Sequence, residues 1–70
     1  MSAEKALLDA KNRIYKDIKL EMNRQGYSNV SLADLLNIRK SLVSYAIRGG
    51  TTPRDFKIRK KIYKVLGMEE

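Results

Sequence analysis

The placement of glycine and proline is the feature that most constrains how this 70-residue chain can fold. The four glycines are Gly26, Gly49, Gly50 and Gly67, and the single proline is Pro53. Between these residues no stretch alternates apolar and polar residues as a strand would. Apolar residues instead recur at intervals of three and four, as on one face of an α-helix. We therefore expect an all-α fold, a small bundle of four helices in one domain spanning residues 1–70.

The first 25 residues predict one long helix from about residue 3 to residue 25, ended by Gly26. Residues at helical spacing form a mainly apolar stripe along it: Leu7, Lys11, Ile14, Ile18, Met22 and Gln25, widened by Leu8 and Tyr15. Leu20 lies off this stripe. We expect Leu20 to be exposed or to contact a partner.

Capping signals predict two short helices in the middle of the chain. Ser31, followed by Asp34 three residues later, is typical of an imperfect capping box and predicts a helix over residues 32–36. A second short helix is expected from about residue 39 to residue 48, where the glycine pair ends it.

The stretch Thr52-Pro53-Arg54-Asp55 predicts the start of a last helix, over about residues 53–66. It combines a capping threonine, a proline at the first helical position and an acid in the first turn. We expect this helix to end at Gly67 and to bury Phe56, either Ile58 or Arg59, and then Ile62, Val65 and Leu66.

The composition excludes several kinds of chemistry. Histidine and cysteine are absent, so the usual zinc ligands, disulfides and the usual general base at neutral pH are all missing. No apolar run approaches the roughly 18 residues that a membrane span requires, and the N-terminus lacks the apolar core of a signal peptide. We therefore expect a soluble cytoplasmic protein associated with the nucleoid. We expect no enzymatic activity, metal, cofactor, small-molecule ligand or membrane contact.

Positive charge is concentrated in the second half of the chain. The net charge is +7, yet residues 39–64 alone hold nine basic groups against one acid, Asp55. Residues 35–54 contain no acid at all. A basic segment of this kind favours a polyanion, most commonly nucleic acid, although a solvated face is the alternative. We expect that alternative for four lysines that would attract a polyanion only at long range: Lys57, Lys60, Lys61 and Lys64.

Residues 31–50, SLADLLNIRKSLVSYAIRGG, meet the requirements of a helix-turn-helix. Ala33 is small enough for two helices to cross closely, and Asn37 tolerates the left-handed conformation that the turn demands. Ile38 then fills the gap between the helices. Helical spacing assigns five more apolar residues to the inner face: Leu32, Leu36, Val43, Ala46 and Ile47.

The same spacing defines the outer face of the second helix. Its residues are Arg39, Lys40, Ser41, Ser44, Tyr45 and Arg48. Such side chains bond phosphates, donate to guanine edges or pack against thymine methyl groups. An ordinary surface helix more often mixes glutamate with lysine, so we predict that this face binds double-stranded DNA.

This stretch resembles the helix-turn-helix of the lambda-repressor-like DNA-binding domains, which include phage repressors and Cro proteins. VSYAIRG is similar to the corresponding segment of LacI-type headpieces, and SLVSYAIRGG with KIRKKIYKVLG resembles the Ner-like phage regulators. The chain departs from the family pattern at Asn37, where glycine is usual. It also departs at Leu35, Leu42 and Ile47, which are more apolar than exposed positions of the motif.

The resemblance implies a sequence-specific transcriptional regulator, of the phage- or prophage-repressor type. It implies that a recognition helix enters the major groove and reaches base edges through Lys40, Ser41, Ser44 and Tyr45, with Arg39 and Arg48 contacting bases or backbone. It implies phosphate contacts from Ser31, Thr51, Thr52 and Arg54. The alternatives are that Ser31 only caps a helix, that Tyr45 lies flat on the protein, and that Leu35 and Leu42 pack on the first helix.

One recognition helix reads only a few base pairs, so we expect a homodimer that binds two half-sites. Candidate interfaces are Leu20, the turns around Leu7 and Leu8, and the region of Met68. Two other functions stay open. One is an architectural or excisionase-like accessory factor, although the sequence shows no strand for the usual wing. The other is a protein-interaction module such as an antirepressor, which explains the many leucines but not the acid-free stretch.

Overall fold

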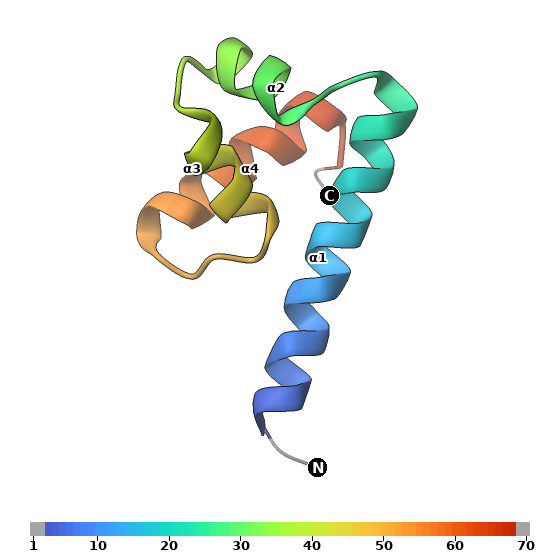
Figure 1. Cartoon of the computed structure of the whole chain (residues 1–70), viewed down its shortest axis with the longest axis vertical. Helices are drawn as coiled ribbons and strands as arrows, with labels where there is room; N and C mark the ends of the chain where they lie inside the picture. The colour runs from blue at the N-terminus through green and yellow to red at the C-terminus, as the bar shows by residue number, and fades with distance from the viewer. Residues whose placement is uncertain (1–2, 69–70) are drawn as a thin grey trace.

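The computed structural model describes residues 3–68, which form four helices and no strand (Figure 1). In chain order these are α1 (Ala3–Gln25), α2 (Asn29–Leu36), α3 (Lys40–Ile47) and α4 (Pro53–Leu66). The expected all-α architecture is therefore confirmed. None of the helices in this described range is long and apolar enough to cross a membrane.

The three shorter helices gather around the C-terminal half of α1, and the first turns of α1 extend beyond them (Figure 1). The molecule measures 39 × 24 × 21 Å along its principal axes. A helix of 23 residues is about 34 Å long at the standard rise per residue. The long dimension of the molecule is therefore set mainly by α1.

The core is formed by apolar residues from all four helices: Ile18, Met22, Leu32, Ala33, Val43, Ala46, Ile47, Ile58, Ile62 and Leu66. α3 lies at its centre, because it packs against α4, α2 and α1. Its approach to α1 is close at Gly49, where an added Cβ atom would lie 3.1 Å from the Cα atom of Lys11. Gly49 also has a φ of +89°, which favours glycine.

The stripe predicted along α1 is buried only in its second half. Ile18 and Met22 are buried and Ile14 is partly buried, whereas Leu7 and Leu8 are 55% and 57% exposed. The stripe continues at helical spacing, but the other helices do not reach the first turns of α1 (Figure 1). Leu20, which lies off the stripe, is exposed as expected.

The predicted start of the second helix is wrong by one turn. α2 begins at Asn29, and its N-cap is Ser28 rather than Ser31. The N–H of Ser31 donates to the Ser28 hydroxyl at 3.1 Å, and the N–H of Ser28 donates to the Ser31 hydroxyl at 2.8 Å. The earlier cap satisfies two orphan amides reciprocally and adds three residues to a helix that would otherwise be very short.

The turn between α2 and α3 has the predicted conformation. Asn37 is left-handed, with φ 57° and ψ 46°. The N–H of the following Ile38 donates to the carbonyl of Ala33 at 2.9 Å, which closes the end of α2. The chain is thereby turned into α3 after only three residues, and α2 and α3 pack against each other.

α4 begins as predicted but buries a different set of residues. Thr52 caps it and forms a capping box with Asp55. Phe56, which we expected inside, is 54% exposed, whereas Ile58 and Arg59 are both buried. The guanidinium of Arg59 donates hydrogen bonds to two backbone carbonyls, which offsets part of the cost of burying its charge. It also lies 5.0 Å from the centre of the Phe56 ring. Val65 is only partly buried.

A matched pair of valine substitutions tests which side of α3 faces the core. Val43 is fully buried and Val30, on α2, is 52% exposed. Val43→Ala should lower the free energy of unfolding by at least about 1 kcal/mol, because it leaves a cavity. Val30→Ala should change it by less than about 0.5 kcal/mol. Urea denaturation followed by circular dichroism measures both, and equal stabilities would show that α3 is rotated from this orientation.

Candidate nucleic-acid interface

α3 presents one side to the core and the opposite side to solvent. Val43, Ala46 and Ile47 are buried on the inner side. The outer side, which we call the α3 surface, comprises Arg39, Lys40, Ser41, Ser44, Tyr45 and Arg48. All are exposed except Ser44, which is half-buried. Lys40, Ser41, Ser44, Tyr45 and Arg48 are spaced by three and four residues, so these five side chains lie together on one face. Arg39 lies before the helix, and helical spacing does not place it on that face.

The α3 surface offers several kinds of contact. Arg39 precedes the helix as its N-cap, and its side chain makes no capping hydrogen bond. Tyr45 is 62% exposed, so most of its ring is not covered by the protein. Arg48 lies 5.9 Å from the centre of the Tyr15 ring on α1, which orients its side chain at the edge of the surface.

Acidic groups are kept away from the cations of this surface. No carboxylate among the described residues forms an ion pair with Arg39, Lys40 or Arg48. The first acid after α3 is Asp55, which is buried and whose carboxylate accepts the N–H of Thr52 at 3.4 Å. Phosphate approaching α3 therefore meets several unneutralised cations and no exposed acid from residue 35 to residue 54.

The loop after α3 holds the other predicted phosphate contacts. Thr51, Thr52 and Arg54 are all exposed and follow the C-terminal end of α3 directly. The Thr52 hydroxyl accepts the N–H of Asp55 at 3.1 Å as the cap of α4, which leaves the hydroxyl proton available to an outside acceptor. These three residues extend the polar surface beyond the helix.

Ser31 is not the N-cap of α2, as was expected, but bonds to Ser28, which is the N-cap. Its hydroxyl accepts the N–H of Ser28 and lies 3.0 Å from the Ser28 carbonyl, to which it donates. The hydroxyl therefore has no spare proton. At the same helix end, no hydrogen bond in the described part of the chain engages the N–H groups of Asn29 and Val30. Such unpaired amides are the donors that a helix N-terminus offers to phosphate.

A buried arginine, to which the sequence assigned no role, holds the end of α3. Arg59 on α4 is 6% exposed and donates from Nη1 to the carbonyls of Ala46 at 2.8 Å and Gly50 at 3.0 Å. The last carbonyls of a helix have no partner within it and carry partial negative charge. Arg59 therefore fixes both the end of α3 and the loop that follows. Nothing in the sequence distinguishes it from the neighbouring lysines except its register with Asp55 and Ile62.

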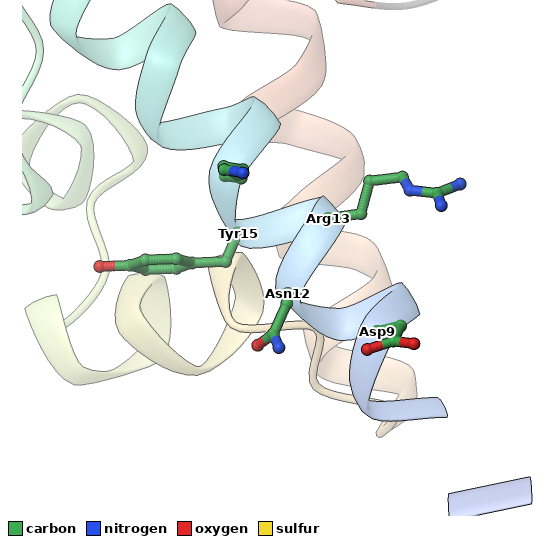
Figure 2. Close-up of a pocket in the computed structure, with 5 residues that line it drawn as sticks. Asp9, Asn12, Arg13 and Tyr15 are labelled. Atoms are coloured by element: carbon green, nitrogen blue, oxygen red, sulfur yellow. The ribbon is translucent and has the colours of Figure 1, made fainter. Parts of the chain in front are cut away.

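One hollow along α1 lacks the features of a ligand site. Figure 2 shows this hollow, lined by Asp9, Asn12, Arg13, Tyr15 and Lys16. Tyr15 extends from α1 toward α3, whereas Arg13 points the opposite way. All the lining residues belong to one helix, so the hollow has no opposing wall and its polar groups do not converge on one point.

The two leucines that depart from the motif have different environments. Leu42 is partly buried against the core, while Leu35 is 56% exposed. The alternative in which Leu35 packs on α1 is therefore wrong.

Comparison of the chain with protein-family models, curated proteins and solved structures finds no match. The resemblance to lambda-repressor-like domains stays a prediction. The functional argument accordingly depends on the chemistry and geometry of the α3 surface.

Replacing Arg59 tests whether it holds the end of α3. Arg59→Met should lower the free energy of unfolding by at least about 1.5 kcal/mol, because two carbonyls lose a charged donor. Lys60→Met, at an exposed neighbouring position, should change it by less than about 0.5 kcal/mol. Chemical denaturation of both variants makes the comparison, and equal midpoints would contradict the role given to Arg59.

Proposed function

We propose that this protein is a sequence-specific, non-enzymatic DNA-binding regulator of the phage- or prophage-repressor type, and that its α3 surface enters the major groove. The observation that carries the proposal is the α3 surface itself. It is an exposed, basic and acid-free face on a helix whose opposite face is buried.

The dimensions and chemistry of α3 suit the major groove of B-DNA. An α-helix with its side chains is about 10–12 Å across and the groove is about 12 Å wide. Lys40 and the two arginines, Arg39 and Arg48, can donate to the O6 and N7 atoms of guanine. The hydroxyls of Ser41 and Ser44 can donate or accept, so together these groups can distinguish one base pair from another.

Phosphate contacts would position α3 in the groove. Thr51, Thr52 and Arg54 are exposed next to its C-terminal end. At the N-terminus of α2, the unpaired amides of residues 29–30 replace the Ser31 hydroxyl as the donors to a phosphate. The exposed lysines of α4 would add sequence-independent attraction to the polyanion.

One observation favours a second candidate, a protein-interaction module such as an antirepressor. Val30 and Leu35 on α2 are both more than half exposed, and Leu20 on α1 is too. These side chains are scattered over two helices, and single exposed apolar residues are common on protein surfaces. DNA binding remains the better explanation because it also accounts for the unpaired cations of the α3 surface.

Two substitutions in the α3 surface test the proposal on a duplex enriched from a random pool. Lys40→Ala and Tyr45→Ala should each weaken binding by about 1–3 kcal/mol, because each removes a contact to a base edge. Lys16→Ala, an exposed lysine on α1, removes the same charge as Lys40→Ala and should have a much smaller effect. Fluorescence anisotropy measures the affinities, and circular dichroism confirms that the variants are folded.

The same titrations repeated over a range of salt concentrations separate the two candidates. Phosphate contacts release counterions, so the affinity for DNA should fall steeply as salt rises. Equal affinities of Lys40→Ala, Tyr45→Ala and Lys16→Ala, together with a flat salt dependence, would reject the DNA-binding proposal and favour the protein-interaction module.

A further inference from the structure

The first turns of α1, residues 4–10, are helical although no other described part of the molecule packs against them. Every side chain from residue 4 to residue 10 is exposed, including those of Leu7 and Leu8. Helical segments this short are marginal in water unless their apolar side packs against something. These first turns therefore present an unpartnered apolar face.

Four residues define this face, which we call the α1 end face: Glu4, Leu7, Leu8 and Lys11. They occupy positions i, i+3, i+4 and i+7 and line one shallow hollow. Along the helix the order is acid, leucine, leucine, base. No ion pair with another described residue engages the Glu4 carboxylate or the Lys11 ammonium group.

We propose that the α1 end face is the dimer interface of this protein and pairs antiparallel with the same face of a second copy. A two-fold axis passing between Leu7 and Leu8 places Leu7 against the partner's Leu8. It also places Glu4 against the partner's Lys11, and symmetry repeats both contacts. Parallel pairing would instead bring like charges together, Glu4 with Glu4 and Lys11 with Lys11.

The order of the charges along the α1 end face favours a second copy of this chain over other binding partners. On this face one acid, Glu4, balances one base, Lys11, so nucleic acid would gain no net attraction there and would leave Leu7 and Leu8 uncovered. An unrelated apolar helix could cover the leucines but would match the flanking charges only by chance. The reversed copy of this same face matches them by symmetry.

The other interface candidates are weaker. Leu20 is exposed on α1 with no apolar neighbour at helical spacing on its own side of the helix. Met68 is partly buried against the protein's own core, and its N–H donates to the Tyr63 carbonyl at 2.8 Å. Neither residue offers a face that a second molecule could cover.

The α1 end face continues into the angle where α1 joins the body. A second hollow there is lined by Leu8, Lys11, Asn12, Tyr15 and Arg48. Tyr15 reaches across this angle from α1 toward α3, as Figure 2 shows. In the antiparallel register the partner's α1 begins at Ala3, opposite Asn12, so it covers only the Leu8 and Lys11 side of this hollow.

The pairing also has a consequence for DNA, which rests on the proposed function. With the axis between Leu7 and Leu8, the two copies of Ile18, where α1 packs into each body, would lie about 32 Å apart along the paired helices. That spacing is close to the 34–36 Å, about one turn of B-DNA, that separates half-sites.

Sedimentation equilibrium without DNA tests the interface directly. The interface is small, so we expect a monomer–dimer equilibrium visible between about 10 µM and 1 mM. Leu7→Gln/Leu8→Gln should raise the dissociation constant at least about tenfold, because it removes the apolar centre from both copies. The control Leu20→Gln/Leu35→Gln replaces two equally exposed leucines outside the α1 end face and should leave the constant within about threefold. A monomeric wild type, or a control that dissociates as much as the test variant, would overturn the proposal.

A charge reversal tests the antiparallel register. Glu4→Lys and Lys11→Glu each replace two attractive contacts with two repulsive ones, and each should weaken the dimer about tenfold. The combined variant restores opposite charges across the axis and should return to within about threefold of wild type. Glu4→Lys also removes a favourable acid from the N-terminus of α1, which weakens the dimer without any change in pairing. Adding Lys11→Glu would not repair that loss, so recovery in the combined variant reports the register. A combined variant as weak as the single variants would overturn the register.

These measurements are independent of DNA, so the two proposals can fail separately. A monomer that binds an enriched duplex through α3 would contradict only the α1 pairing. A dimer that binds no DNA would contradict only the proposed function.

Discussion

The orientation of α3 is the constraint on which the other features of this protein depend. Its inner side chains, Val43, Ala46 and Ile47, are completely or almost completely buried among the other three helices. Its start is set by the left-handed Asn37, and its end by the carbonyls that Arg59 binds. A helix of eight residues has little stability of its own, so these contacts decide which side chains it presents to solvent.

Because the orientation of α3 is fixed, one set of its side chains packs in the core and another set stays exposed for binding. The apolar half of the helix is used by the core, and the remaining half holds cations, hydroxyls and one tyrosine, with no acid from residue 35 to residue 54. The same fixed contacts would give these groups a defined geometry before any ligand binds, which reduces the entropy cost of recognition. α1 has a different role at its two ends, since its second half completes the core and its first half projects (Figure 1).

Local signals in the sequence were sufficient to predict that four helices form and which side of α3 is exposed. The ends of α1 and α4, the left-handed Asn37 and the Thr52 cap follow from residue types that each conformation requires. The exposed face of α3 follows from the spacing of its buried residues. The functional roles of its side chains were not tested by any of these observations and remain predictions.

Features that depend on tertiary contacts could not be obtained in this way. Ser28 and Ser31 offer the same capping chemistry one turn apart, and only the folded chain shows which one begins α2. Apolarity favoured Phe56 for the core of α4 and left Ile58 and Arg59 as alternatives, whereas hydrogen bonds to two distant carbonyls allow Arg59 to be buried together with Ile58. The periodicity of α1 likewise carries no information about how far along it the other helices extend.

Selection of bound duplexes from a random DNA pool tests the central claim most directly. If α3 reads base edges, the recovered sequences should share a motif, and a dimer should produce two inverted half-sites about one helical turn apart. Recovery of sequences with no shared motif, at a salt concentration where the protein still binds the pool, would contradict sequence-specific recognition by α3.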